Sequence, residues 1–275
     1  PPPNHQTTKS PYEKRTHMLV KTFASAVQGV DAQTITVEVN AGGVYSGNGP
    51  MYFLVGLPDS VIREGFPRIE AALKNSQFLM SRLKLTINLA PADIRKEGSA
   101  YDLPIAIGIL AATDQMSPAG LEQYVIMGEL SLDGSLRPIK GALPIAVQAR
   151  AEKFKGMILP KQNAREAAIV NKLDVFGVNS LTEAVDFLAG RLKIEPTVVD
   201  TREEFANNQE IFNVDFSDVR GQDNVKRALE LAAAGGHNAI LIGPPGAGKT
   251  MLARRMPTIL PPLSLFEALE TTKIH

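Results

Sequence analysis

A phosphate-loop pattern near the end of the chain constrains the fold more than any other feature of the sequence. The pattern G-x-x-x-x-G-K-[ST] is met by Gly243, Pro244, Pro245, Gly246, Ala247, Gly248, Lys249 and Thr250. A strand-like apolar segment, 238–242, precedes it, and a helix-compatible segment, 251–256, follows it. Such a loop needs this order, because its glycines let backbone N–H groups wrap a phosphate at the N-terminus of a helix. The sequence therefore predicts a site for ATP.

Two side chains of the loop have predicted roles, and the residues after the loop limit what the chain can do. We expect Lys249 to reach the outer phosphates and the Thr250 hydroxyl to ligate the Mg²⁺ that accompanies ATP. Only 25 residues follow Thr250, and their only acids are Glu267 and Glu270. We expect these two carboxylates on the surface of an amphipathic helix, whereas hydrolysis needs an acid that holds Mg²⁺ and polarises water. The chain is therefore expected to be truncated, to bind ATP weakly or not at all, and not to hydrolyse it.

Composition excludes several classes of protein. Hydrophobic residues at 44% and charged residues at 21% are typical of a soluble globular protein. Basic and acidic residues number 29 each, so the overall charge does not argue for nucleic acid. The absence of cysteine excludes disulfides and thiolate metal sites, and the four histidines lack ligand spacing. No apolar run is long enough to span a bilayer and no signal peptide is visible, which predicts a cytoplasmic protein without membrane contact.

The pattern along the chain predicts four parts. Residues 1–17 are polar and proline-rich, and we expect a disordered leader there. Residues 18–189 alternate strand-like and helix-like segments, which predicts an α/β domain. Residues 190–213 are acidic and amide-rich, as is typical of a linker. Residues 214–275 form a second module that contains the phosphate loop.

Local signals predict the elements of the first domain. The expected strands are 34–40, 51–55, 84–90, 156–159 and 175–178, and the expected helices are 103–113, 142–154 and 164–170. Asp59 or Ser60 could cap a further helix, in which Pro67 indicates a kink or a late start. The dipeptide Asp133-Gly134 predicts a hairpin turn, and Ser180 with Glu183 opens a last helix. In the second module a helix is expected at 224–234.

Motifs in both parts resemble one family of ATPases. Segments 218–222, 243–250, 259–263 and 267–270 resemble the start of the magnesium-chelatase type of AAA+ ATPase. Together with segments 55–59, 96–104, 128–137 and 159–163, they are similar to the YifB/ComM group of Mg-chelatase-like proteins. The resemblance implies a partial AAA+ domain of the P-loop NTPase class. It also implies a hexameric motor that acts on DNA in branch migration, competence and recombination. A metal-chelatase subunit and a non-enzymatic assembly module remain alternatives.

The first domain is also similar to the proteolytic domain of Lon, which has the fold of ribosomal protein S5 domain 2. Lon-type proteolysis uses a serine nucleophile and a lysine base. When segment 96–99 is aligned with the run before the Lon nucleophile, the nucleophile position falls on Ala100. When segment 139–141 is aligned with the turn before the Lon base, the base position falls on Ile145. Neither side chain can do this chemistry, so a peptidase is not expected. A displaced dyad of Ser99 and Lys140 is the alternative; the simpler reading makes Ser99 and Asp102 caps or turn residues before the 103–113 helix.

Overall fold

The computed structural model describes residues 18–44, 51–80, 83–199, 214–260 and 267. The chain divides into two compact units, Pro1–Val199 (unit 1) and Asp200–His275 (unit 2). The predicted leader, 1–17, lies outside the described residues, as does the 200–213 part of the predicted linker. In the described part of that linker, the Thr197 N–H donates to the Val175 carbonyl at 2.8 Å, so this stretch contacts the edge of the unit 1 sheet.

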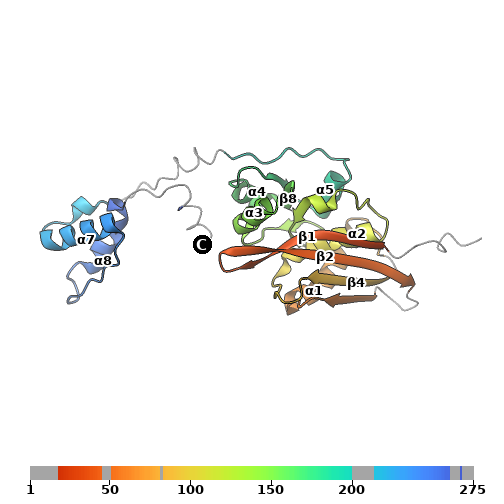
Figure 1. Cartoon of the computed structure of the whole chain (residues 1–275), viewed down its shortest axis with the longest axis horizontal. Helices are drawn as coiled ribbons and strands as arrows, with labels where there is room; N and C mark the ends of the chain where they lie inside the picture. Colours follow the sequence, from red (N-terminus) through yellow and green to blue (C-terminus); the bar gives the residue numbers. More distant parts are fainter. Residues whose placement is uncertain (1–17, 45–50, 81–82, 200–213, 261–266, 268–275) are drawn as a thin grey trace, which may run out of the picture. The chain divides into compact units, whose positions relative to one another are not determined.

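Unit 1 is built on a seven-stranded mixed sheet (Figure 1). Its strands are β1 (Met18–Gln28), β2 (Asp31–Val44), β3 (Met51–Val55), β4 (Leu83–Ala90), β5 (Tyr124–Ile126), β8 (Gly156–Pro160) and β9 (Asp174–Val178). Their order across the sheet is β3-β4-β2-β1-β5-β8-β9. The neighbours β1, β2 and β4 are antiparallel, and all other pairs are parallel. Together with the helices that follow its parallel strands, this sheet confirms the expected α/β class.

Alternating side chains specify the central strands. In β2 the buried residues Ile35, Val37 and Val39 alternate with partly exposed neighbours, and β4 repeats this pattern. The two strands predicted from alternation are therefore confirmed, with β2 longer than expected. Strand β1 was not among the predicted strands, because its mixture of small and polar residues lacks a clear period. Its pairing specifies it instead, with β1 and β2 in continuous register from Met18 opposite Ala41 to Gln28 opposite Asp31.

The described residues of unit 1 form five α-helices, and one of them is wholly buried. They are α1 (Ser60–Asn75), α2 (Asp102–Ala112), α3 (Ala142–Ala151), α4 (Lys161–Ala167) and α5 (Leu181–Leu188). All eleven residues of α2 are buried, and the helix packs across β1 and β2. Gly108 makes the close approach possible, because a Cβ there would stand 2.6 Å from a methyl carbon of Val39. The core of unit 1 therefore lies between α2 and the middle of the sheet.

Caps and turns agree with most local predictions. Asp59 caps α1 by accepting the Ile62 N–H at 2.8 Å, and the helix runs through Pro67 from Ser60, so the predicted late start is wrong. Ser180 caps α5 as predicted. The predicted hairpin is confirmed as β6 (Glu129–Leu130) and β7 (Leu136–Arg137).

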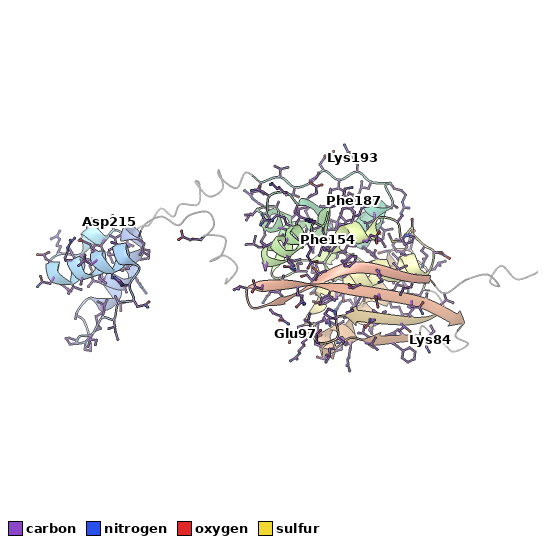
Figure 2. The ribbon with its side chains drawn as sticks, in the orientation of Figure 1. Lys84, Glu97, Phe154, Phe187, Lys193 and Asp215 are labelled. Atoms are coloured by element: carbon purple, nitrogen blue, oxygen red, sulfur yellow. The ribbon has the colours of Figure 1, made fainter. Side chains whose placement is uncertain are left out.

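Aromatic side chains attach α5 to the far edge of the sheet. Phe187, labelled in Figure 2, lies with its ring centre 4.5 Å from that of Phe176 on β9. The same ring lies 6.0 Å from Tyr124 on β5. Offset and edge contacts of this kind stabilise aromatic clusters beyond the area they bury. The cluster joins the last helix of unit 1 to its last parallel strands.

Unit 2 is small and mostly helical in its described part. It contains η3 (Phe216–Asp218), α7 (Asp223–Gly235), α8 (Lys249–Arg255) and η4 (Met256–Ile259). The expected helices at 224–234 and 251–256 are confirmed by α7 and α8. A small core of Phe216, Val219, Leu229 and Leu252 holds them together.

The strand predicted at 238–242 is not formed. These residues have no regular secondary structure, and Ile240 and Ile242 are 84% and 88% exposed. A strand is stable only beside another strand, and the described residues of unit 2 contain no second one. The apolar sequence is therefore strand-like but has no strand to pair with among residues 214–260.

We expect Gly108→Val to destabilise unit 1 by about 2–3 kcal/mol, because the added side chain must displace Val39 from a packed core. Urea unfolding followed by circular dichroism measures the change. The double variant Gly108→Val with Val39→Ala should lose less stability than the two single variants lose together, because alanine at position 39 leaves room for the new valine. A Gly108→Val variant as stable as the wild type would contradict the tight contact.

Candidate nucleotide site and a buried ionic network

The phosphate-loop residues form a turn that depends on two glycines. Gly246 and Gly248 have φ angles of +82° and +80°, which residues with a Cβ rarely adopt. Gly248 directly precedes α8, so the chain leaves the turn into a helix as the pattern predicts. The predicted order of turn and helix is present, while the strand before it is missing.

The lysine of the loop lies against the loop's own backbone. Its Nζ donates to the Gly243 carbonyl at 2.8 Å and to the Pro244 carbonyl at 2.7 Å. Thr250 follows in the first turn of α8 and is exposed. The ammonium group and the hydroxyl are thus both at the turn, where an anion and its metal ion would find a cation, a hydroxyl ligand and a helix start. These donors fit a phosphate group with Mg²⁺.

Contacts from other elements hold the two sides of the loop. The Gln222 side-chain amide donates to the Ala247 carbonyl at 3.2 Å, a contact that no local sequence pattern indicates. Behind the loop, Leu252 of α8 is buried in the unit 2 core. Arg255 at the end of α8 forms an ion pair with Asp218 at 3.2 Å. Glu270 lies outside the described residues, so the expectation for Glu267 and Glu270 as a pair is not tested.

The two Lon-like positions lie on different elements of unit 1. Ala100 lies in the short 3-10 turn Ser99–Tyr101 (η1), and Ile145 is buried within α3 with 1% of its surface exposed. The Ser99 hydroxyl donates to the Glu129 carboxylate, while the Lys140 side chain is exposed. The structure therefore gives the Ser99 hydroxyl a carboxylate acceptor and not the lysine of the displaced dyad.

Next to η1, the buried carboxylate of Asp102 is the centre of a network of hydrogen bonds. The sequence predicts Asp102 as a cap or turn residue. Arg68 of α1 binds Asp102 with two hydrogen bonds, Nε to Oδ2 at 2.6 Å and Nη2 to Oδ1 at 3.1 Å. The Leu130 N–H adds a third, at 3.2 Å. Neither Ser99 nor Asp102 caps α2, because the residue before that helix is Tyr101, without a side-chain cap. The capping interpretation is therefore wrong: Asp102 joins α1, α2 and β6.

Burial and the ion pair with Arg68 shift the pKa of Asp102 in opposite directions. Burial raises the pKa of Asp102 to about 6, and the Arg68 guanidinium and the Leu130 N–H offset part of that increase. The same pairing raises the pKa of Arg68. Near neutral pH the carboxylate is thus ionised, and its charge depends on Arg68 because the side chain of Asp102 is only 2% exposed.

A buried lysine holds the start of the Lon-like run in place. Lys96 is fully buried, and its ammonium group donates to the carbonyls of Gly56 and Pro91. Burial lowers the pKa of Lys96. Asp59, which caps α1, also accepts the Gly98 N–H at 3.0 Å. The segment before Ser99 is therefore fixed by structural hydrogen bonds.

Two kinds of site are absent from the described part of the chain. Within it, no group of three or more His, Cys, Asp or Glu side chains is arranged to hold a metal ion. None of its helices combines the length and apolar character that a membrane span requires.

Comparison with known proteins identifies the family. A family model described as subunit ChlI of Mg-chelatase matches residues 31–163, and one described as magnesium chelatase, subunit ChlI, matches residues 215–275. The competence protein ComM of Haemophilus influenzae is 41% identical over 252 residues, which is 92% of this chain and 48% of ComM. This chain belongs to the Mg-chelatase-like YifB/ComM family. The YifB proteins of Salmonella typhimurium and Escherichia coli are 43% and 42% identical, each over 90% of this chain and 47% of YifB.

The comparisons cover both units but not the full length of the relatives. The two family models together match the chain of unit 1 from β2 to β8 and unit 2 from residue 215 onward. The chain spans about half the length of the curated relatives it matches. The resemblance recognised from the motifs is confirmed at the level of the family.

Replacing Arg68 by Met should destabilise unit 1 by about 3–5 kcal/mol at about pH 8, because it leaves a buried carboxylate without its cation. The folded-state pKa of Asp102, about 6, exceeds the ordinary value of 3.8 for an aspartate, so stability falls as pH rises through this window. Without Arg68 the folded-state pKa rises further, and the loss extends to higher pH. The deficit should therefore be smaller at about pH 5 than at about pH 8 in urea unfolding.

The matched control is the double variant Arg68→Met with Asp102→Asn, which removes both charges and keeps an acceptor for the Leu130 N–H. It should recover part of the stability lost at about pH 8. Because it lacks the titrating carboxylate, it does not share the fall in wild-type stability with rising pH, so its deficit should be smaller at about pH 8 than at about pH 5, the reverse of the single variant. Equal deficits for Arg68→Met at both pH values would show that Asp102 does not depend on this cation.

Proposed function

We propose that this family member binds ATP with Mg²⁺ through residues 243–250. The observation that carries the proposal is the turn itself, with two positive-φ glycines, a lysine on the turn and a threonine at the start of α8. Backbone N–H groups of such a turn complement phosphate oxygens. The loop chemistry in the sequence and the Mg-chelatase family models support the same ligand.

Each side chain of the loop has a defined task in this proposal. Lys249 exchanges the carbonyls of Gly243 and Pro244 for phosphate oxygens, because a bond between two charged groups is stronger than one to a neutral carbonyl. Thr250 would offer its hydroxyl to the Mg²⁺ that accompanies the nucleotide. The metal ion, when bound, neutralises phosphate charge and makes the terminal phosphorus more open to attack.

We also propose the finer fold assignments implied by the resemblance. Unit 1 is assigned the Lon-protease-like fold of ribosomal protein S5 domain 2, without the catalytic dyad, because Ala100 and Ile145 stand at the dyad positions. Unit 2 is assigned a partial AAA+ domain of the magnesium-chelatase type, with the phosphate loop as its Walker A motif. The matches of the two family models to separate segments support this division.

For the complete protein we propose a cytoplasmic, ATP-driven motor that assembles as a hexamer and acts on DNA in branch migration, competence and recombination. The support is the 41% identity to a relative named as a competence protein. A subunit of a metal chelatase is the second candidate, and the descriptions of the family models favour it. Unit 1 without its dyad would serve as an assembly module in either case.

Replacing Lys249 by Ala should weaken ATP binding about 10- to 100-fold, because a charge-assisted contact to phosphate is lost. Isothermal titration of the 275-residue chain with Mg-ATP measures the affinity. The matched control is Lys161→Ala, which removes an exposed lysine of unit 1 and should bind as the wild type does.

The same chain should release phosphate from ATP slowly, since its only acids after Thr250 are Glu267 and Glu270. A colorimetric phosphate assay with Lys249→Ala as the blank decides this point. Rapid release that depends on Lys249 would show that the 275 residues already hold a competent site.

A polypeptide of the length of the relatives should bind forked and single-stranded DNA, and tighter at low than at high salt, because phosphate contacts release counterions. Filter binding at two salt concentrations, with and without Mg-ATP, measures this. A metal chelatase would show no such affinity and would instead show ATP-dependent insertion of Mg²⁺ into a porphyrin. Absence of DNA binding at both salt concentrations would contradict the motor.

A further inference from the structure

One contact to the phosphate loop comes from outside its turn and helix. The Gln222 side-chain amide donates to the Ala247 carbonyl at 3.2 Å, across 25 residues of chain. The amide nitrogen also lies 3.5 Å from the point where a Cβ on Gly248 would stand. The Gln222 amide thus binds the carbonyl of the Ala247–Gly248 peptide group and lies beside Gly248.

The backbone of Gln222 is held in place independently of the loop. Gln222 precedes α7 in the left-handed conformation, with φ +56°, and its carbonyl accepts the N–H groups of Val225 and Lys226 at 2.9 Å each. Helix α7 is in turn fixed to α8 through Leu229 and Leu252 of the unit 2 core. The Gln222 side chain therefore extends toward the loop from a backbone position that the unit 2 core holds in place.

Holding a carbonyl also orients the N–H on the other side of the same peptide bond. In a planar trans peptide the C=O and the next N–H point in opposite directions, so a carbonyl directed at Gln222 directs the Gly248 N–H away from it. Glycine adopts positive and negative φ with similar ease, so this peptide group could otherwise turn over at little cost. The turned peptide would present its carbonyl oxygen on the side where the N–H now lies, and an oxygen there repels an anion.

We propose that Gln222 is a positioning residue for the phosphate loop: by binding the Ala247 carbonyl, it keeps the Gly248 N–H available to a phosphate oxygen. The proposal rests on the proposed nucleotide binding of residues 243–250. It assigns to Gln222 an effect on the phosphate chain and none on the base or the sugar. Loss of the amide should therefore lower the affinity for every ligand that carries the phosphate chain by the same factor.

Two variants separate positioning from a structural role in the turn. Gln222→Asn keeps an amide and suits the left-handed conformation better than glutamine, but it is one methylene too short to reach the Ala247 carbonyl. Gln222→Met keeps the length and removes the donor. If Gln222 only supported the backbone at the start of α7, the Asn variant would match or exceed the wild type in every property.

The experiment is a titration of the 275-residue chain and its variants with Mg-ATP and with magnesium tripolyphosphate, which has no base or sugar. Isothermal titration gives the affinities, and thermal unfolding checks that the variants fold. We expect both variants to bind both probes about 2- to 10-fold more weakly, the effect of one hydrogen bond, with the Asn variant at least as stable as the wild type.

The outcomes distinguish this inference from the proposal on which it rests. A wild type that binds neither probe contradicts both. Binding that Lys249→Ala loses but Gln222→Asn and Gln222→Met retain contradicts the positioning role alone. A loss for Mg-ATP without a loss for tripolyphosphate also overturns it, because Gln222 would then act on the nucleoside.

Discussion

The burial of α2 across β1 and β2 is the constraint on which unit 1 depends. A helix buried on every side must enter the core with its polar start satisfied, because an unpaired charge or N–H there is costly. Asp102 lies at that start, and Arg68 and the Leu130 N–H satisfy it. Since these partners belong to α1 and β6, one carboxylate fixes three elements around the end of the helix.

The residues before α2 are held by hydrogen bonds on the same side of unit 1. The turn Ser99–Tyr101 leads directly into α2, and its neighbours Lys96 and Asp59 are bound to backbone groups. Ser99 itself donates to Glu129. The polar side chains around this turn are therefore occupied by hydrogen bonds that hold the segment before α2 in place.

Sequence patterns predicted the features that depend on residues close along the chain. The alternation in β2 and β4, the caps at Asp59 and Ser180, and the turn of the phosphate loop all follow from such local patterns. The pair of Arg68 and Asp102, 34 residues apart, and the contact of Gln222 with the loop have no local signal. Strand β1 and the failed strand at 238–242 make the same point, because pairing decides whether a strand forms.

The unpaired segment 238–242 also affects how this polypeptide behaves in concentrated solution. Ile240 and Ile242 are almost fully exposed, and the run Ala239–Ile-Leu-Ile242 carries no charge. Short uncharged β-prone stretches of this kind are where separate chains join edge to edge. Aggregation of the isolated chain should therefore begin here, and light scattering should rise with concentration unless a charged residue at Ile240 or Ile242 interrupts the run.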